Sequence, residues 1–265
     1  MDSWQLHDGH SVSDPTTPVT ILSSTTTEGS TSESGGNNPI VANFYSNSKK
    51  LVHPSLIRVI DTACDVTSVK SSYMSLSNAS SQKTMYYIVT EPLERLTEEN
   101  LKQMSRDDVI NGLYNIIQGL SFLHANNLMM GALTVFVTKN GDWKLFDYSF
   151  LTPFVTPEGA NFQTLDDNFC NNYRNYMHLF PPEIEANATT IRYDMGVGVH
   201  VVDAYNLGKF IDFVFRGRVP DKLKKAQGRL LVDKARSRPR LPGINSCSIF
   251  IISMYRWTNL VLSCF

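Results

Sequence analysis

The sequence lacks several features that would define a protein class at once. Its four cysteines are widely scattered and form no Cys-x-x-Cys pair, which excludes a dense disulfide framework and a cysteine-rich zinc module. A net charge of −1 gives no overall attraction to nucleic acid or membranes. The first ten residues contain neither a basic region nor an apolar run, so no secretory signal is expected. These absences favour a cytoplasmic protein with reduced thiols and no nucleic-acid partner.

Long apolar runs are also scarce. The one membrane candidate, residues 248–265, is shorter than the roughly 20 residues that a span needs. Arg256 at its centre would cost about 2.5–3.5 kcal/mol on insertion. We therefore expect no transmembrane span and treat 246–265 as an apolar tail, a buried helix being favoured over a tail anchor.

The remaining composition supports a folded protein interrupted by polar loops. A hydrophobic content of 42% over 265 residues is enough for one large domain or two small ones. Residues 23–38 and 65–84 are rich in serine and threonine and poor in apolar side chains, so both are predicted to be flexible loops. A phosphorylated regulatory loop is the alternative for 23–38.

Residues 105–149 carry the clearest pattern, which predicts a helix, a short loop and a hairpin. Apolar side chains from Val109 to His124 recur with the period of one helical face, and Ser105 is placed to cap its start. Asn140-Gly141 predicts a tight turn with positive φ at both positions. Further strands are predicted at 4–7, 18–22, 55–64 and 85–90, and further helices at 40–52 and 197–215; 150–180 is loop-rich.

This central stretch, which ends in Asp147-Tyr148-Ser149, resembles the catalytic centre of eukaryotic protein kinases, where the second strand ends in Asp-Phe-Gly. Other kinase-like motifs follow in the family's order: His53-Pro54, a gatekeeper-like Thr90, Pro181-Pro182-Glu183, Asp203 to Gly208 and Arg238-Pro239. The resemblance implies an α+β, two-lobed, protein-kinase-like fold. It implies a shortened small β lobe over 1–91 and a mainly helical large lobe over 92–245.

The groups that bind nucleotide in that family are missing at the matching positions. No lysine or arginine precedes Lys49, so Leu22 stands where the family has its strand lysine. Residues 40–52 contain no carboxylate, and Phe44 stands near the place of the lysine's glutamate partner. Gly9 is the only glycine before Gly29, which excludes a glycine-rich phosphate loop. By resemblance, Thr90, Glu91 and Leu93 form a vestigial hinge.

The catalytic loop lacks its base as well. No Asp or Glu occurs between Asp108 and Asp142, and Met130-Gly131-Ala132 stands where the family has His-Arg-Asp. Only Asp147 remains as a candidate metal ligand. The structural motifs are kept: by resemblance, Glu183 and Arg238 form a buried salt bridge, and Asp203 anchors the loop's backbone.

Finer features resemble the Scy-like, or N-terminal kinase-like, pseudokinases. The most telling are VFV at 135–137 and GDWKL at 141–145, with KLVHP at 50–54 and YIVTEP at 87–92. The resemblance implies an inactive scaffold without cofactor, bound to protein partners such as vesicle coat components in Golgi–ER traffic. Family members continue into HEAT repeats, so a truncated isoform is expected. The alternative is a protein kinase or an ATP-binding protein that uses Mg²⁺.

One further stretch is strongly basic. Residues 216–240 hold ten Lys or Arg against Asp221 and Asp233. We interpret this excess of positive charge as a solvent-exposed face of the protein. The alternative is a surface that docks RNA or an anionic membrane.

Overall fold

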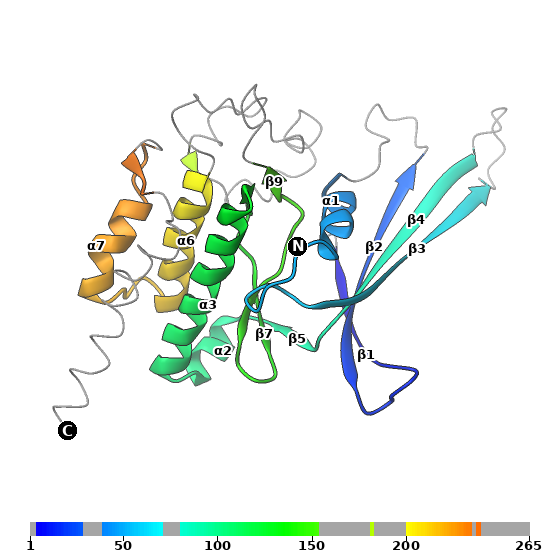
Figure 1. Ribbon diagram of the computed structural model, residues 1–265, viewed down its shortest axis with the longest axis horizontal. Helices are drawn as coiled ribbons and strands as arrows, with labels where there is room; N and C mark the ends of the chain where they lie inside the picture. Colours follow the sequence, from blue (N-terminus) through cyan, green and yellow to red (C-terminus); the bar gives the residue numbers. More distant parts are fainter. Residues whose placement is uncertain are drawn as a thin grey trace.

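The computed structural model describes residues 4–28, 39–70, 80–153, 181–182, 200–234 and 237–239. An antiparallel four-stranded sheet occupies one side of the molecule, and helices occupy the other (Figure 1). The sheet has the order β1–β2–β4–β3, with β1 at Gln5–His10, β2 at Pro18–Glu28, β3 at Val59–Lys70 and β4 at Ser80–Thr90.

These strands are longer than predicted. β2 takes in the first part of the expected loop at 23–38, and β3 and β4 take in both ends of the expected loop at 65–84. Their serines and threonines pair through main-chain groups, with Thr26 opposite Thr84 and Thr84 opposite Val66. β-branched threonine suits a pleated strand, so the polarity of these segments did not by itself distinguish a loop from a strand. Residues 29–38 and 71–79 lie outside the described part of the chain.

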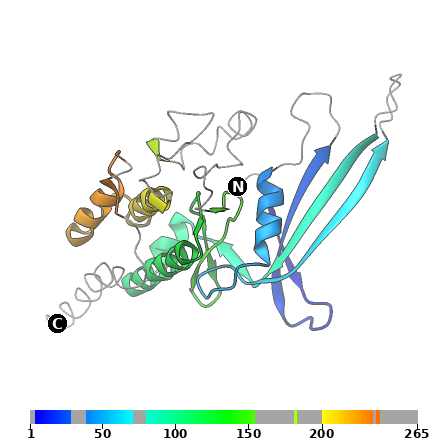
Figure 2. The same ribbon diagram turned by 45° about the horizontal axis from the view of Figure 1, so that its top comes forward.

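Helix α1, Pro39–Ser48, lies against this sheet, near the prediction of 40–52. It presents Val41 and Phe44, both fully buried, and its Tyr45 ring lies 5.1 Å from the ring of Tyr86 on β4. Figure 2 shows α1 running alongside β2 and β4. Apolar side chains at α1 positions three and four apart thus cover the sheet with a single face.

The segment after α1 joins the two sides of the molecule. The strand predicted at 55–64 begins only at Val59. Before it, Leu145 N donates to Ser55 O at 2.8 Å, and Ile57 N donates to Leu145 O at 3.1 Å. These main-chain bonds hold residues 55–57 against strand β8, Trp143–Leu145, instead of in the four-stranded sheet.

A second sheet of order β5–β7–β8 contains the predicted hairpin. β5 is Leu93–Arg95, and β7 is Val135–Thr138. Of the two turn residues, Gly141 has φ +86°, whereas Asn140 does not adopt positive φ. The prediction of positive φ at both positions is therefore wrong, and the hairpin uses a longer loop with one left-handed glycine.

Helix α3, Arg106–Ala125, begins where the sequence indicated. Ser105 N donates to Asp108 Oδ2 at 3.0 Å, and Asp108 N donates to Ser105 Oγ at 3.2 Å, which is a reciprocal capping box. The short helix α2, Glu98–Gln103, precedes it with a capping box of its own and was not predicted.

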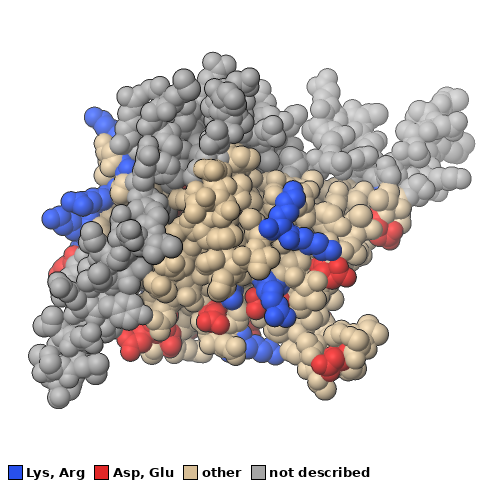
Figure 3. Space-filling model, viewed as in Figure 1, with Lys and Arg blue, Asp and Glu red and all other residues tan. Residues whose placement is uncertain are grey.

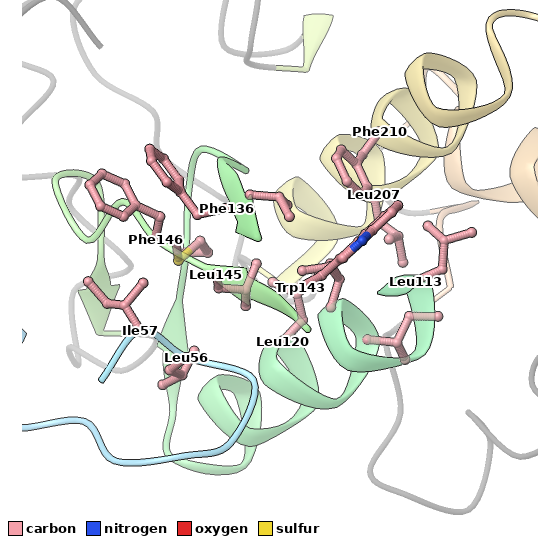
Figure 4. Packing of buried hydrophobic residues seen from close by; sticks show 14 of the residues in the cluster. Leu56, Ile57, Leu113, Leu120, Phe136, Trp143, Leu145, Phe146, Leu207 and Phe210 are labelled. Atoms are coloured by element: carbon pink, nitrogen blue, oxygen red, sulfur yellow. The ribbon is translucent and has the colours of Figure 1, made fainter. Parts of the chain in front are cut away.

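The core lies between α3, β8 and the helix α6, His200–Phe215 (Figure 4). Trp143 is fully buried, and its ring meets the Phe210 ring edge-on at 5.8 Å. A Cβ on Gly112 would lie 2.1 Å from the Trp143 ring, so only glycine lets the indole approach α3.

The remaining elements complete the helical side. The helix α7, Asp221–Leu230, packs beside α6, and the short strands β6, Leu128–Met129, and β9, Thr152–Pro153, pair with each other. The predicted helix at 197–215 corresponds to α6 from His200 onward. Within the described ranges, no helix combines the length and apolarity that a bilayer crossing requires. The tail 246–265 lies outside them.

Candidate functional site

The loop between β6 and β7 is held by one turn of α6. Asp203, 1% exposed, accepts from Met130 N through Oδ2 and from Gly131 N through Oδ1, both at 2.9 Å. His124 Nε2 on α3 lies 2.8 Å from the same Oδ2. Asn206, three residues along α6, donates to Gly131 O at 2.6 Å. The structure thus brings Asp203 and the loop together. It adds Asn206 to the site, a residue that sequence reasoning missed; its position three residues after Asp203 places both side chains on one face of α6 and could have indicated it.

Gly131 leaves no room for a side chain in this loop. Its φ is +82°, and a Cβ there would lie 2.8 Å from Phe150 Cβ and 2.9 Å from Phe150 O. A non-glycine residue would have to combine strained backbone with a main-chain clash. Met130 and Ala132 on either side are both buried. This loop therefore offers solvent no acidic or basic side chain at these three positions.

Asp147 follows β8 and is 5% exposed. Its Oδ1 accepts from Ser149 N at 2.9 Å. Burial raises the pKa of the Asp147 carboxyl, and hydrogen bonds from Ser149 oppose that shift. Among the described residues, no group of three His, Cys, Asp or Glu side chains could hold a metal ion. A magnesium ion at Asp147 would therefore take its other ligands from water or a bound phosphate, not from a cluster of such side chains among the described residues.

An aromatic cluster fills the region between α1, β8 and the segment after it. The Phe44 ring meets the rings of Trp4, Phe146 and Tyr148 at 5.0, 5.3 and 5.4 Å, each edge-on. Leu22 on β2 is fully buried and belongs to the same core. Burial also raises the pKa of the Tyr148 phenol. Positions 22 and 44 therefore contribute to an apolar core, with no charged group at either.

Next to this cluster, one amide holds the segment after β8 against α1. Asn43 Nδ2 lies 2.8, 3.0 and 3.2 Å from the main-chain oxygens of Ser149, Leu151 and Tyr148. The sequence offered no signal for this contact, because the partners are more than a hundred positions away. Asn43 thus supplies a donor to carbonyls at the edge of the core, one of which, Tyr148 O, also accepts from Leu151 N at 3.1 Å.

The predicted hinge makes its hydrogen bonds within the chain. Leu93 N donates to Thr20 Oγ1 at 3.0 Å. Thr90 Oγ1 lies 2.9 Å from Glu91 O and 3.3 Å from Thr20 O. Two main-chain groups of this segment, Leu93 N–H and Glu91 C=O, are therefore already engaged by threonine hydroxyls.

The hinge is also tied to neighbouring segments. Arg58 N donates to Glu91 Oε1 at 3.0 Å, and Lys144 Nζ lies 3.9 Å from the same oxygen. The His53 ring stacks on Phe122 at 4.7 Å, and burial, with a smaller effect from Lys144, lowers the pKa of His53. Side chains from three segments therefore hold the junction in one arrangement.

A cavity of about 330 Å³ opens beside the hinge. The ends of β1 and β2 form one wall, and residues 92–94 with Lys139 form the other. Thr20, its innermost polar residue, is 3% exposed and already accepts from Leu93 N. The cavity thus offers mixed polar and apolar walls, and the Leu93 N–H on its hinge side is already engaged by Thr20.

Arg238 lies in a buried position, and its predicted partner Glu183 lies outside the described residues. The guanidinium donates to Val232 O at 2.7 Å and Asp233 O at 3.0 Å, and it lies 4.7 Å from the centre of the Tyr205 ring. Arg238 therefore connects the segment after α7 to α6 through these contacts alone, independently of the predicted salt bridge to Glu183.

The rest of the basic stretch is partly engaged within the protein. Arg216 donates to Glu98 O at 2.9 Å, and Lys224 pairs with Asp221 at 3.3 Å. Figure 3 shows basic side chains on the side of the molecule where α7 lies. Along the lower edge of the visible face, basic and acidic side chains are intermixed.

Together, the mixed sheet-and-helix arrangement and the anchored loop define a protein of the kinase-like fold. The solved structure of the ROP18 kinase domain in complex with AMP-PNP and sucrose is similar, with a TM-score of 0.55 and 11% identity over 91% of this chain and 73% of that one. In all, 693 solved chains match. No protein-family model and no curated protein matches the sequence. An identity this low supports the fold and says nothing about activity.

Proposed function

We propose that this chain is a pseudokinase: a kinase-fold protein without phosphoryl-transfer activity that serves as a scaffold or interaction module. The observation that carries the proposal is the apolar core at positions 22 and 44. Phosphoryl transfer in this fold depends on a lysine and its glutamate partner to hold the nucleotide's phosphates. By resemblance, Leu22 and Phe44 stand at or near those two positions; both are fully buried, and neither carries a charge.

The loop supports the same conclusion. Loss of a general base alone typically lowers a rate by about 10²–10⁴. Met130-Gly131-Ala132 supplies no base, and Ala132, which by resemblance stands at the position of the family's Asp, is 1% exposed. Loss of electrostatic stabilisers costs about 10²–10³ more for each group.

Nucleotide binding is the alternative function, and the hinge argues against it. In the kinase family the hinge main chain binds the adenine base. Here Leu93 N donates to Thr20 Oγ1, so adenine would have to displace that internal hydrogen bond. Glu91 O accepts from Thr90 Oγ1 but keeps a second lone pair. The free energy of breaking the bond between Leu93 and Thr20 is subtracted from the binding free energy, so the affinity for nucleotide falls. Asp147, the one candidate metal ligand, remains in favour of the alternative.

The finer proposal is a Scy-like scaffold, cytoplasmic and Golgi-associated, that binds vesicle coat components. It rests on the motifs at 135–137 and 141–145 and on the resemblance they carry. A longer transcript that encodes HEAT repeats after Gly243 would support it. If purified coat subunits fail to bind both this chain and such a longer product, the trafficking role is wrong, while the inactive fold is unaffected.

Thermal melting with ATP and Mg²⁺ tests the nucleotide question directly. A ligand at 100 times its Kd stabilises a protein by about 2.7 kcal/mol. We expect no shift in Tm at millimolar ATP with Mg²⁺, with an active kinase as positive control. A shift of several degrees would establish the alternative.

Radiolabelled phosphate incorporation tests catalysis separately. We expect incorporation at background for the wild-type chain and for Asp147→Ala. Incorporation well above background that Asp147→Ala abolishes would overturn the pseudokinase proposal. Incorporation that persists in Asp147→Ala would point to a contaminating kinase, which repurification to constant specific activity removes.

A further inference from the structure

Positive charge is concentrated toward the C-terminal end of the chain. Residues 209–265 hold twelve Lys or Arg against three Asp or Glu, whereas residues 1–208 hold twelve against twenty-two. The net charge of −1 therefore combines two regions of opposite sign. An asymmetry of this kind is typical of a protein that binds an anionic surface through one of its ends.

Helix α7 carries part of this charge on a single exposed face. Its Leu223 and Leu230 are buried against the rest of the protein. Its exposed residues recur three or four positions apart and therefore share one side of the helix: Asp221, Lys224, Lys225, Gly228 and Arg229. The helix thus presents three cations and one acid to solvent among its described side chains.

The acid on this face neutralises only one of the cations. Asp221 pairs with Lys224 at 3.3 Å, in a contact where the Asp221 side chain is 96% exposed and that of Lys224 62% exposed. Such an exposed pair is weak and is easily exchanged for another partner. Within the described ranges, Lys225 and Arg229 form no ion pair. Both remain available to an anion outside the protein.

The other two acids of this end do not remove the excess of positive charge. Asp212 Oδ1 accepts from Gln227 Nε2 at 3.2 Å, so Asp212 faces the contact between α6 and α7. Asp233 is exposed, and the exposed Lys234 follows it directly. The side of the molecule where α7 lies therefore shows mainly basic side chains (Figure 3).

We propose that the exposed face of α7 docks on an anionic lipid membrane, with Lys224, Lys225 and Arg229 against the headgroups. A cluster of about four to eight Lys or Arg on an amphipathic helix is typical of proteins that bind acidic lipids. Helix α7 has four such residues, at 222, 224, 225 and 229. The contact is peripheral, because no exposed residue among the described side chains of α7 is apolar and could insert into the bilayer.

The side chains on this face favour lipid over RNA. Proteins that bind single-stranded RNA stack the bases on aromatic side chains. None of the exposed residues that the structure describes on α7 is aromatic. A layer of lipid headgroups requires positive charge alone and no stacking surface.

The same side chains favour lipid over an acidic or phosphorylated peptide. Such peptides are recognised by clusters of arginine, whose planar guanidinium binds carboxylate and phosphate through two parallel hydrogen bonds. Two of the three exposed cations on α7 are lysines, which act as point charges without a fixed geometry. The cavity described above lies beside the hinge and not at α7. A convex row of point charges fits a laterally mobile layer of anionic headgroups.

Co-sedimentation of the full chain with vesicles tests the proposal. One set of vesicles is phosphatidylcholine alone, and the other contains about 30% phosphatidylserine. We expect binding only to the second set, and an affinity that falls at least about ten-fold between about 0.1 and 0.5 M salt, because salt screens the attraction. Equal binding to neutral vesicles would assign the contact to apolar side chains and overturn the proposal. Absence of binding to phosphatidylserine at low salt would overturn it too.

Charge reversal locates the contact on α7. The double variant Lys225→Glu with Arg229→Glu should bind phosphatidylserine vesicles at least about ten-fold more weakly than the wild type. The matched control is Lys50→Glu with Arg58→Glu, which makes the same change of charge at exposed positions between α1 and β3. We expect the control to stay within about three-fold of the wild type. An equal loss in both would mean that net charge alone matters and would reject the α7 surface.

Folding of the variants is checked by circular dichroism and melting. If the reversed variant does not fold, Lys225→Gln with Arg229→Gln keeps the test, with an expected loss of at least about three-fold. Affinity unchanged in this folded variant would overturn the proposal.

Fluorescence anisotropy with single-stranded and double-stranded RNA at the same salt separates lipid from nucleic acid. We expect no RNA binding at protein concentrations that saturate the phosphatidylserine vesicles. RNA binding that is at least as tight as vesicle binding, and that Lys225→Glu with Arg229→Glu abolishes, would show that the surface serves RNA and that the membrane proposal is wrong.

Discussion

The side-chain amide of Asn43 donates to the main-chain oxygen of Ser149 at 2.8 Å, although the two residues stand 106 positions apart. This bond joins α1 to the segment that follows β8, beside the aromatic cluster around Phe44. The helix is held against the core without any charge.

Replacing Asn43 with alanine should destabilise the protein by about 1–3 kcal/mol, because part-buried carbonyls lose their donor. The free energy of unfolding in urea measures the change. Ser46→Ala, at an exposed position of the same helix, is the control and should change stability by less than about 0.5 kcal/mol. Equal effects at both positions would show that the tether contributes nothing.

Replacing Asp203 with alanine should cost more. The N–H groups of Met130 and Gly131 would each be buried without an acceptor, at about 1–3 kcal/mol for each group. We expect a loss of about 2–6 kcal/mol in the free energy of unfolding. Asp221→Asn, on the exposed face of α7, is the control. A loss below about 1 kcal/mol would mean that the loop finds other partners.

Gly112 in α3 and Gly228 in α7 should respond in opposite directions to alanine. At Gly112 the new Cβ would meet the Trp143 ring at 2.1 Å, and overpacking of this kind costs about 1–3 kcal/mol or more. At Gly228 nothing lies within 4 Å, so alanine should stabilise α7 by about 0.5–1 kcal/mol. Changes in Tm of the same sign in both variants would contradict the packing of Trp143 on α3.

The Asp147→Asn variant should be more stable than the wild type at neutral pH. Burial raises the folded-state pKa of Asp147, so between its unfolded and folded pKa values the folded state binds a proton that the unfolded state has released. Wild-type stability therefore falls as pH rises through that window, and the neutral amide avoids the loss. The gain should vanish below about pH 4, near the unfolded pKa.

Urea unfolding from pH 3.5 to 7 measures this difference, with Asp142→Asn in the exposed turn as the control. Asn at position 147 can still accept from Ser149 N. If Asp147→Asn destabilises the protein increasingly toward pH 7, the carboxylate is stabilised in the fold, and a cationic partner must face it.

Local sequence signals predicted the elements that local interactions define. Ser105 and Asp108 start α3 because a capping box needs only four consecutive residues. The hairpin after residue 134 was also predicted, although the predicted turn, with positive φ at both Asn140 and Gly141, was wrong. The missed helix α2 carries the same local signal in Thr97 and Asn100, so it could have been found.

Distant interactions set the features that the sequence could not indicate. β2 continues through serines and threonines to Glu28 because β4 supplies a main-chain partner for each residue. The threonine bonds at Thr20 and Thr90 depend on how β2 meets the hinge. No periodicity along one segment contains that information.

The sequence by itself determined which chemical groups are missing, since no fold can supply a lysine before Lys49 or a carboxylate between Asp108 and Asp142. Only the tertiary structure decided which residues are buried and which hydrogen bonds they make. Packing buries Leu22 and Phe44 in one core, and Asp203 folds the Gly131 loop onto α6. The reason is that residue identity is local, whereas burial and hydrogen-bond partners depend on segments that meet only in the folded chain.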